Sequence, residues 1–594
     1  MDFFPKDLKF KKINENELPL DKVFYVYGDN LLEAMQIIRW LAKYNSDKMK
    51  FYRIEYISLS RFVYEYRING DIYYFIAKSY FRDGLLPNDV LQVITNIDKP
   101  DAVIYSPSKK RVLFGFESTS TTLAGNATWQ RAGRTIDFLE KNIPFAFLGY
   151  ASKLDQSQAG PGVKPRRPSN IFVLFYLLLS LKYSTPALIG FYEHEDPRQN
   201  SGYSLNYIEA VFKYAFAHIF EYDNEEDMLT DCFRNMCSYY STVVSKEFSK
   251  KIMDKLLDPN TPRKIVHDIK NKINEKFFDE SDIRLYDWKP KSISGLKDVI
   301  FSDLRIYQLS KNCIAGFCFD TRKLIDTIDS KNNVLSAPYF HNLDEPTIII
   351  PICLTKKQRN KLVRTDDPYN GAISAFSEIY KQSFPKANVM LLLTDHNLAN
   401  NYDVLQSKNH KIYKSITRYA DILLDLDLQI FDKYSSYTYK VSPSRFTHLK
   451  VTEDNVVCFF DSILSSFGIV PSFLNPPCGS WSDLVLFPTS KFYYFKRNDI
   501  RADIAYYLPK KYHIGEAKDS FSNLLHSISN EYNKVISIKN IIENEISDSS
   551  IDYNTFCIFY GAKEEARAAL SYASFDYAII LNDDDEYIYL KVVD

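Results

Sequence analysis

Residues 501–521 have the sequence RADIAYYLPKKYHIGEAKDSF, which predicts a β-hairpin followed by a helix. An apolar run rich in Ile, Tyr and Ala covers 502–508, and Pro-Lys-Lys at 509–511 interrupts it. A second apolar run, 512–517, follows directly. Two apolar runs joined by a short turn segment are typical of a hairpin. We therefore expect two neighbouring strands here.

The hairpin places three chemically active residues together, Asp503, Glu516 and Lys518. Side chains alternate along a strand, so Glu516 and Lys518 should point one way and Ala517 into the core, with Asp503 across from them. Two carboxylates suit a hard divalent cation such as Mg²⁺, which polarises a phosphate oxygen and lowers the pKa of a bound water. The lysine can stabilise phosphate charge or orient the water. The alternative is an exposed Glu–Lys pair that contributes little.

Regular elements are predicted on both sides of the hairpin. A helix is expected over 455–467, a long amphipathic helix over 521–546 and a strand over 555–560. This order resembles the core of the PD-(D/E)XK superfamily, which includes many restriction and repair endonucleases. The family motif is an Asp followed, after a gap, by Glu-x-Lys at a strand end. Here the gap is 13 positions (503 to 516), and Ala502 stands where the motif has Pro. The resemblance implies Mg²⁺ held by Asp503 and Glu516, with Lys518 as the third catalytic residue.

The segment 99–152 repeats this order. Residues 101–107 and 111–116 predict a hairpin, 126–139 a helix and 144–150 a strand. Its Pro100-Asp101 pair matches the family motif literally, and Glu117 follows after 16 positions (101 to 117). Asp101 and Glu117 are thus predicted as a second pair of metal ligands, and Gln130 resembles a glutamine that many family members carry.

Thr119 stands where the second copy should have a lysine. Threonine can hydrogen-bond a phosphate or water but carries no charge. Two interpretations stay open. In the first, a nearby cation (Lys109, Lys110, Arg131 or Arg134) substitutes for the missing lysine, and Thr119 belongs to a catalytic site. In the second, the site is degenerate and binds without cleaving. A βαβ-type module with an incidental Asp and Glu is the simpler alternative.

Two basic segments are predicted to contact the phosphate backbone of DNA. The first lies in the Gly- and Pro-rich loop 151–170, and the second in the run TKKQRNKLVR at 355–364. The predicted DNA-binding residues are Lys153, Lys164, Arg166, Arg167, Lys356, Lys357, Arg359 and Arg364. A solvated linker and a solvated helix face are the respective alternatives.

Composition excludes several classes of protein. The eight cysteines contain no CxxC pair, which argues against a zinc site. The net charge of −1 argues neither for nor against nucleic acid, because a DNA cleft needs only local positive charge. We expect reduced thiols in a cytoplasmic protein. The longest apolar run, 171–181, is shorter than the about 20 residues that span a bilayer. No P-loop signature is present, so ATP is not expected as a partner.

At 594 residues the chain should form several domains of α/β (α+β) type. We expect a first nuclease-like module over 1–170, a mainly helical region over 171–255, a mixed region for possible DNA recognition over 256–445, and a nuclease domain over 446–594. The whole resembles two-site, type IIS-like restriction endonucleases acting on double-stranded DNA. If both sites are active, each cuts one strand and a monomer suffices. The alternatives are a DNA-binding or anti-phage defence protein with silent nuclease folds, and a structure-selective repair nuclease.

Overall fold

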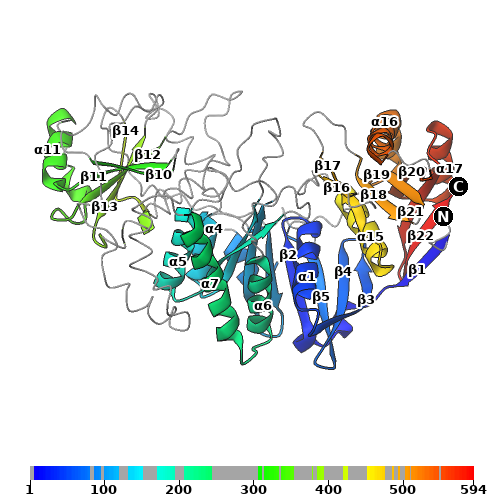
Figure 1. The fold of residues 1–594 in the computed structure, drawn as a ribbon, viewed down its shortest axis with the longest axis horizontal. Coiled ribbons are helices and arrows are strands. Elements are labelled where there is room, and N and C mark those ends of the chain that lie inside the picture. Colours follow the sequence, from blue (N-terminus) through cyan, green and yellow to red (C-terminus); the bar gives the residue numbers. More distant parts are fainter. Residues whose placement is uncertain are drawn as a thin grey trace.

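The computed structural model describes most of the two ends of the chain and part of its middle. The described residues are 6–80, 86–94, 100–119, 132–151, 170–193, 207–243, 305–310, 313–332, 336–352, 377–378, 381, 384–393, 419–425, 451–474, 484–486, 492–494, 502–508, 510–546 and 550–594. Within them, helices and mixed sheets give an α+β fold, as predicted. The sheets follow one another along the long axis of the molecule (Figure 1).

The N-terminal sheet has eight strands in the order β3-β4-β5-β2-β6-β7-β8-β9. Its strands are β2 (Val23–Gly28), β3 (Met49–Ser58), β4 (Arg61–Ile68), β5 (Asp71–Ser79), β6 (Ala102–Ser106), β7 (Arg111–Thr119), β8 (Phe145–Ala151) and β9 (Ala187–Glu193). The helices of this part are α1 (Leu31–Tyr44), α2 (Asn88–Ile94), α4 (Ala132–Leu139), α5 (Asn170–Tyr183), α6 (Tyr207–Ile219) and α7 (Glu225–Val243). Short 3₁₀ turns lie at Glu15–Glu17 and Leu20–Lys22.

The predicted boundary at residue 170 falls inside this sheet. β9 pairs in parallel with β8, and α6 packs its apolar side into the same core. Residues 171–255 were predicted as a separate, mainly helical region, and that prediction missed β9. The strand is short and apolar, and such a run cannot be told from a helix segment by periodicity alone.

The C-terminal sheet has seven strands in the order β1-β22-β21-β20-β19-β18-β15. Its strands are β1 (Asp7–Lys11), β15 (Pro471–Leu474), β18 (Ile504–Leu508), β19 (Lys511–Lys518), β20 (Asp552–Tyr560), β21 (Tyr577–Asp583) and β22 (Tyr587–Val593). Its helices are α15 (Glu453–Ser466), α16 (Phe521–Ile546) and α17 (Lys563–Tyr572). A separate pair joins β16 (Leu484–Leu486) to β17 (Phe492–Tyr494).

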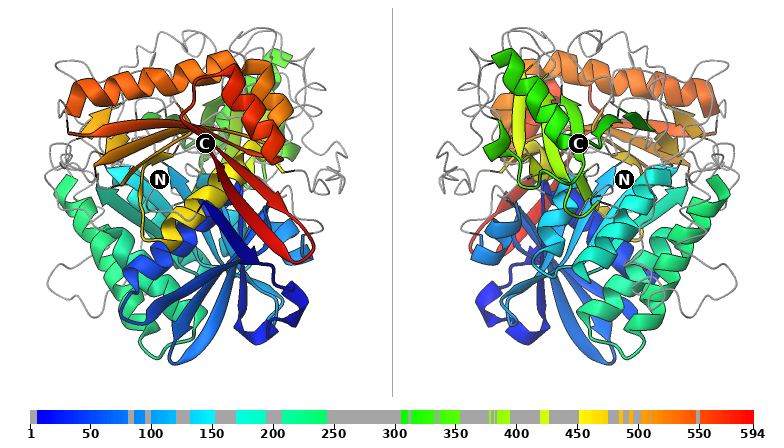
Figure 2. Two further views of the ribbon diagram at one scale, coloured as in Figure 1. Left: turned by 90° about the vertical axis from the view of Figure 1, so that its right-hand side faces the viewer. Right: turned by 90° about the vertical axis from the view of Figure 1, so that its left-hand side faces the viewer.

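The predicted hairpin is present. β18 and β19 run antiparallel, and β20 lies parallel to β19 on its other side. α15 packs on one face of the sheet with Phe556 and Ile558, and α16 packs on the other with Ile514 and Phe559 (Figure 2). The predicted helices and strand around the hairpin are confirmed within a few residues of their bounds.

The first strand of the chain belongs to the last sheet. β1 pairs antiparallel with β22, so that Lys9 lies opposite Tyr589 and Lys11 opposite Tyr587. Figure 1 shows the two ends of the chain side by side at this edge. β1, which falls within the predicted first module (1–170), therefore belongs to the C-terminal sheet. Pairing between strands so distant in sequence leaves no local pattern to predict it.

The middle of the chain contributes a smaller five-stranded sheet of order β10-β11-β12-β13-β14. Its elements are β10 (Arg305–Ser310), β11 (Cys313–Cys318), α11 (Thr321–Asn332), a 3₁₀ turn (Ala337–Tyr339), β12 (Thr347–Ile352), β13 (Asn388–Leu393) and β14 (Ile422–Asp425). β12 and β13 run parallel to each other, as do β13 and β14, so this mixed region of the prediction contains both strands and a helix.

Helices α1 and α15 join the N-terminal and C-terminal sheets. The Arg39 guanidinium lies 2.6 Å from Asp461 Oδ2 and donates to Ser465 Oγ at 3.1 Å. The Asp461 side chain is completely buried, and one apolar core runs through both sheets around this contact. The two modules are thus packed as one body rather than linked by a flexible tether.

The apolar run at 171–181 lies within α5, where Phe172, Val173 and Phe175 are fully buried. Among the described residues, no helix has the length and apolar character needed to cross a membrane.

Candidate metal centre

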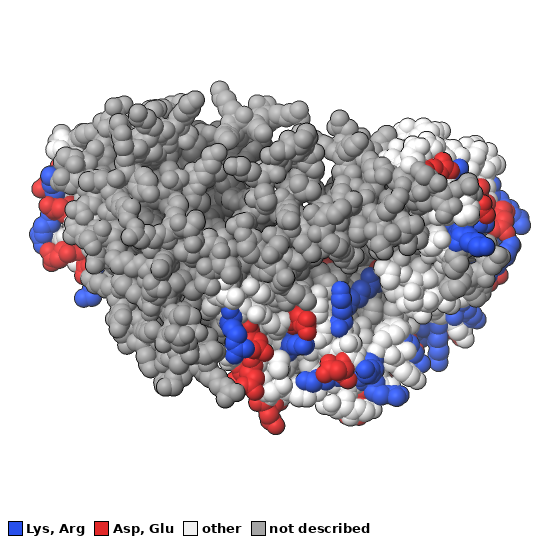
Figure 3. Space-filling model, in the orientation of Figure 1, with Lys and Arg blue, Asp and Glu red and all other residues white. Residues whose placement is uncertain are grey.

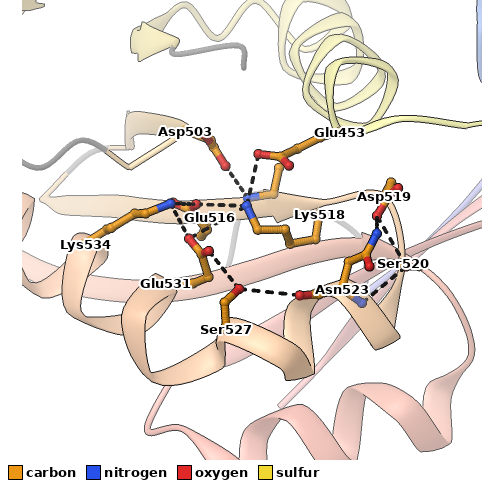
Figure 4. Close-up of polar contacts among 11 residues, drawn as sticks. Glu453, Asp503, Glu516, Lys518, Asp519, Ser520, Asn523, Ser527, Glu531 and Lys534 are labelled. Carbon is orange, nitrogen blue, oxygen red and sulfur yellow. Dashed lines mark hydrogen bonds and ion pairs between the residues drawn. The ribbon is translucent and has the colours of Figure 1, made fainter. Parts of the chain in front are cut away.

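The sheet brings the three predicted C-terminal residues together. Asp503 lies just before β18, and Glu516 and Lys518 lie at the end of β19. Asp503 Oδ2 accepts the backbone N–H of Ala517 at 2.8 Å, which fixes the carboxylate across from the Glu-x-Lys segment. Ala517 is buried in the core, and Lys518 Nζ lies 3.2 Å from Glu516 Oε1 on the other face. The predicted alternation is confirmed (Figure 4).

A third carboxylate joins this group from α15. Glu453, the first residue of that helix, lies with Asp503 and Glu516 so that one oxygen of each is within 4.8 Å of the others. Sequence reasoning missed Glu453 because it began the helix at Asn455. The available signal was Thr452, whose N–H donates to Asn455 Oδ1 at 3.0 Å, a capping contact that sets the helix start at Glu453.

Two lysines compensate these carboxylates. Lys518 Nζ lies 3.0 Å from Glu453 Oε1, and Lys534 Nζ on α16 lies 2.8 Å from Glu516 Oε1. Lys534 also pairs with Glu531, one turn earlier on its own helix. Neither Glu531 nor Lys534 was predicted from the sequence. We call Glu453, Asp503, Glu516 and Lys518 the C-terminal cluster; Figure 4 shows Glu531 and Lys534 beside it.

A break in α16 orients Glu531 toward the cluster. Ser527 has non-helical backbone angles (φ −130°, ψ 16°) inside the helix. Its hydroxyl donates to Glu531 Oε1 at 2.9 Å. A side chain inserted at a kink is a recognised way to redirect the next turn of a helix. The kink therefore serves to hold Glu531 where it contacts both Lys534 and Lys518.

Burial dominates the electrostatics of the cluster. Burial, then the charge of Glu453, raises the pKa of Asp503 to about 7. Burial, then Asp503, raises the pKa of Glu516 well above its usual range. Burial would lower the pKa of Lys518, but Glu516, Asp503 and Glu453 outweigh it and raise that pKa. Without a cation, Asp503 and Glu516 therefore hold protons more tightly than exposed carboxyl groups do.

The donor set fits a divalent cation that prefers oxygen. Glu516 is fully buried, and Glu531 lies within hydrogen-bond reach of its carboxyl group. Two adjacent carboxylates cannot hydrogen-bond each other unless one holds a proton, so a bound cation would relieve their repulsion. Three carboxylates from two strands and a helix match the oxygen ligands of Mg²⁺. Asp503, Glu516 and Glu453 would hold the ion, and Lys518 lies beside them.

The N-terminal sheet repeats the same local geometry. Asp101 Oδ2 accepts the backbone N–H of Ser118 at 2.6 Å, as Asp503 accepts that of Ala517. Glu117 precedes Ser118 on β7 and is completely buried. β6, β7 and β8 pair antiparallel and then parallel, the same order as β18, β19 and β20. The predicted repetition of elements is therefore present in the fold.

The cation near this second pair is Arg134 on α4. Its Nη1 forms an ion pair with Glu117 Oε2 and lies 3.7 Å from Asp101 Oδ1. Of the cations proposed from sequence, Lys109 instead pairs with Glu221. Glu33 on α1, which sequence reasoning missed, faces the pair: burial, then Asp101, Asp29 and Glu117, raises its pKa well above the usual range.

Several predicted site residues lie outside the described part of the structure. They are Lys153, Lys164, Arg166, Arg167, Lys356, Lys357, Arg359 and Arg364, together with Gln130, Arg131 and the side chain of Thr119. On the described part of the face in Figure 3, acidic and basic side chains alternate. The predicted DNA contacts therefore remain predictions.

Comparison of the chain with protein-family models, with curated proteins and with solved structures found no match.

Proposed function

We propose that the chain is a Mg²⁺-dependent endodeoxyribonuclease of the PD-(D/E)XK kind, acting on double-stranded DNA as a sequence-specific restriction enzyme. The observation that carries the proposal is the convergence of Glu453, Asp503 and Glu516 within 4.8 Å, beside Lys518. Two buried carboxylates, a third that is partly buried and a lysine at the end of a strand suit phosphodiester hydrolysis better than structural pairing, because burying charged groups is costly.

Each residue has a distinct part in this proposal. Bound Mg²⁺ supplies a polarised phosphate and a water of lowered pKa. Asp503, fixed by the Ala517 N–H, and Glu516, fixed by the strand, keep the ligand oxygens preorganised. Glu453 completes the set from α15. The ammonium group of Lys518 lies beside these ligand oxygens, where it stabilises negative charge on the reacting phosphate or orients the attacking water.

The proposal places the reaction in the cytoplasm, with the segments at 151–170 and 355–364 following the DNA backbone and no need for ATP. The five-stranded sheet and its surrounding residues, in the middle of the chain, are the proposed recognition region. A structure-selective repair nuclease would use the same C-terminal cluster without sequence preference. A defence protein with silent nuclease folds would bind DNA and leave it uncut.

Purified protein incubated with Mg²⁺ and a varied set of plasmids separates these possibilities. Discrete bands support sequence-specific cleavage, a smear or cutting confined to branched DNA supports the repair alternative, and intact plasmid contradicts the proposal. Glu516→Gln should reduce cutting at least about 100-fold while DNA binding is retained, because ligands of a catalytic metal act mainly in the transition state. Glu543→Gln, a charge-matched change on the exposed part of α16, is the control.

A further inference from the structure

The two modules differ in what lies between their carboxylates. In the C-terminal cluster, oxygens of three carboxylates lie within 4.8 Å of one another. Among the described residues, no other three carboxylate, histidine or cysteine side chains come so close together. In the N-terminal module, the Arg134 guanidinium lies between Glu117 and Asp101. Arg134 is largely buried, with 14% of its side chain exposed, so it is part of the site and not a solvent-exposed ion pair.

Arg134 and Lys534 occupy corresponding positions. Each lies on the helix that follows its hairpin, 17 residues after Glu117 and 18 after Glu516, and each contacts that glutamate. Lys534 has a second carboxylate, Glu531, three residues earlier on the same helix. It therefore keeps a counter-ion if a metal takes Glu516. Three residues before Arg134 the sequence has Arg131, another cation.

The chemistry of the two cations strengthens this contrast. Arginine stays charged at every physiological pH, and its planar fork matches carboxylates geometrically. Lysine is a compact point charge on a flexible stem, which moves between partners more easily. A divalent ion entering the N-terminal module would have to displace a guanidinium that already neutralises Glu117, and Thr119 supplies no replacement charge for phosphate.

We propose that Arg134 takes the place of the metal in the N-terminal module, so that this module holds no catalytic ion and the chain has one metal centre, the C-terminal cluster. This rests on the proposed function for the identity of that centre. The N-terminal module is then a non-cleaving copy whose carboxylates position Arg134 and stabilise the hairpin of β6 and β7.

The number of Mn²⁺ ions bound per full-length chain, measured by electron paramagnetic resonance of the free ion, tests this proposal. The wild-type protein should bind one ion, Glu117→Gln should still bind one, and Glu516→Gln none. The double variant Arg134→Gln/Glu516→Gln should recover one ion, now in the N-terminal module. Thermal unfolding of each variant checks that it is folded.

Two ions in the wild type, one of them lost in Glu117→Gln, would overturn the proposal, as would no ion in a folded Arg134→Gln/Glu516→Gln protein. No ion in the wild type would instead contradict the metal centre of the proposed function. The role of Arg134 would then be decided by comparing the number of ions bound by Glu516→Gln with the number bound by the double variant Arg134→Gln/Glu516→Gln. The Glu117→Gln result needs no change at Arg134, so it decides the question even if Arg134 variants fail to fold.

Discussion

Asp503 is the residue whose protonation should control metal binding. Burial, together with the charge of Glu453, raises its pKa to about 7, and burial also raises the pKa of Glu516 well above the usual range, so both groups hold protons more tightly than exposed carboxyl groups do. A metal ligand must be deprotonated, so binding releases protons. We predict that Mn²⁺ or Mg²⁺ affinity falls about tenfold per pH unit for each proton released as pH drops below 7.

Calorimetric titration at pH 6, 7 and 8, in buffers of different ionisation enthalpy, measures both the affinity and the protons released. Glu543→Gln, on the exposed part of α16, leaves the titrating groups of the cluster in place and serves as the control. Equal affinity at pH 6 and 8, with heats independent of buffer, would contradict the prediction.

The same residue should limit the stability of the metal-free protein. A carboxyl whose pKa rises on folding binds more protons in the folded state, so its contribution to stability is present below its unfolded pKa of about 4 and lost as pH rises through 7. We predict that Asp503→Asn raises the thermal midpoint of the metal-free protein at pH 8 and has less effect at pH 5. A midpoint lowered equally at both values would show that the charged carboxylate is stabilising.

At the scale of the helices, the contact between α1 and α15 carries a buried ion pair. Arg39→Ala would leave Asp461 buried without its cation. Breaking such a pair costs about 3–5 kcal/mol, and we expect the lower end because 26% of the Arg39 side chain is exposed. Urea unfolding followed by intrinsic fluorescence measures the loss. The double variant Arg39→Met/Asp461→Leu should recover most of it, and failure to do so would mean that packing, not charge, governs this contact.

The elements nearest the C-terminal cluster were predictable because their signals are local. Two apolar runs, 502–508 and 512–517, with a turn segment between them, predicted β18 and β19, and the alternation of side chains along a strand predicted the face of Glu516 and Lys518. Glu453 was missed for two reasons: the helix was predicted to begin at Asn455, and the place of Glu453 in the cluster depends on how α15 packs, which no sequence spacing records. Arg134 was one of four candidate cations, and only the packing of α4 on the sheet separated it from Lys109.

At the scale of the whole molecule, the proposed single metal centre per chain has a kinetic consequence. A single centre cuts one phosphodiester at a time, so cutting both strands in one binding event requires a second chain. We predict that nicking of supercoiled plasmid rises linearly with protein concentration, whereas conversion to linear DNA rises more steeply. Asp101→Ala should leave both rates unchanged.

Gel quantification of nicked and linear plasmid over a range of protein concentrations tests this. The sequence alone also allowed the opposite outcome, in which each module cuts one strand. Two results together would establish that both modules cut: linear DNA forms at a rate proportional to protein concentration, and the Asp101→Ala protein only nicks. They would exclude a silent N-terminal module.

The pairing of β1 with β22 sets the order in which a newly synthesised chain can be completed. Lys11 leaves the ribosome 576 positions ahead of its partner Tyr587, a delay of roughly 0.5–2 min at ordinary rates of translation. Throughout that interval β1 lacks its partner strand β22, and the sheet that carries Asp503 and Glu516 lacks its outer edge. This sheet is therefore completed last, when the first strand of the chain pairs with its last strand, and a chain that stalls midway lacks the strands that carry the C-terminal cluster.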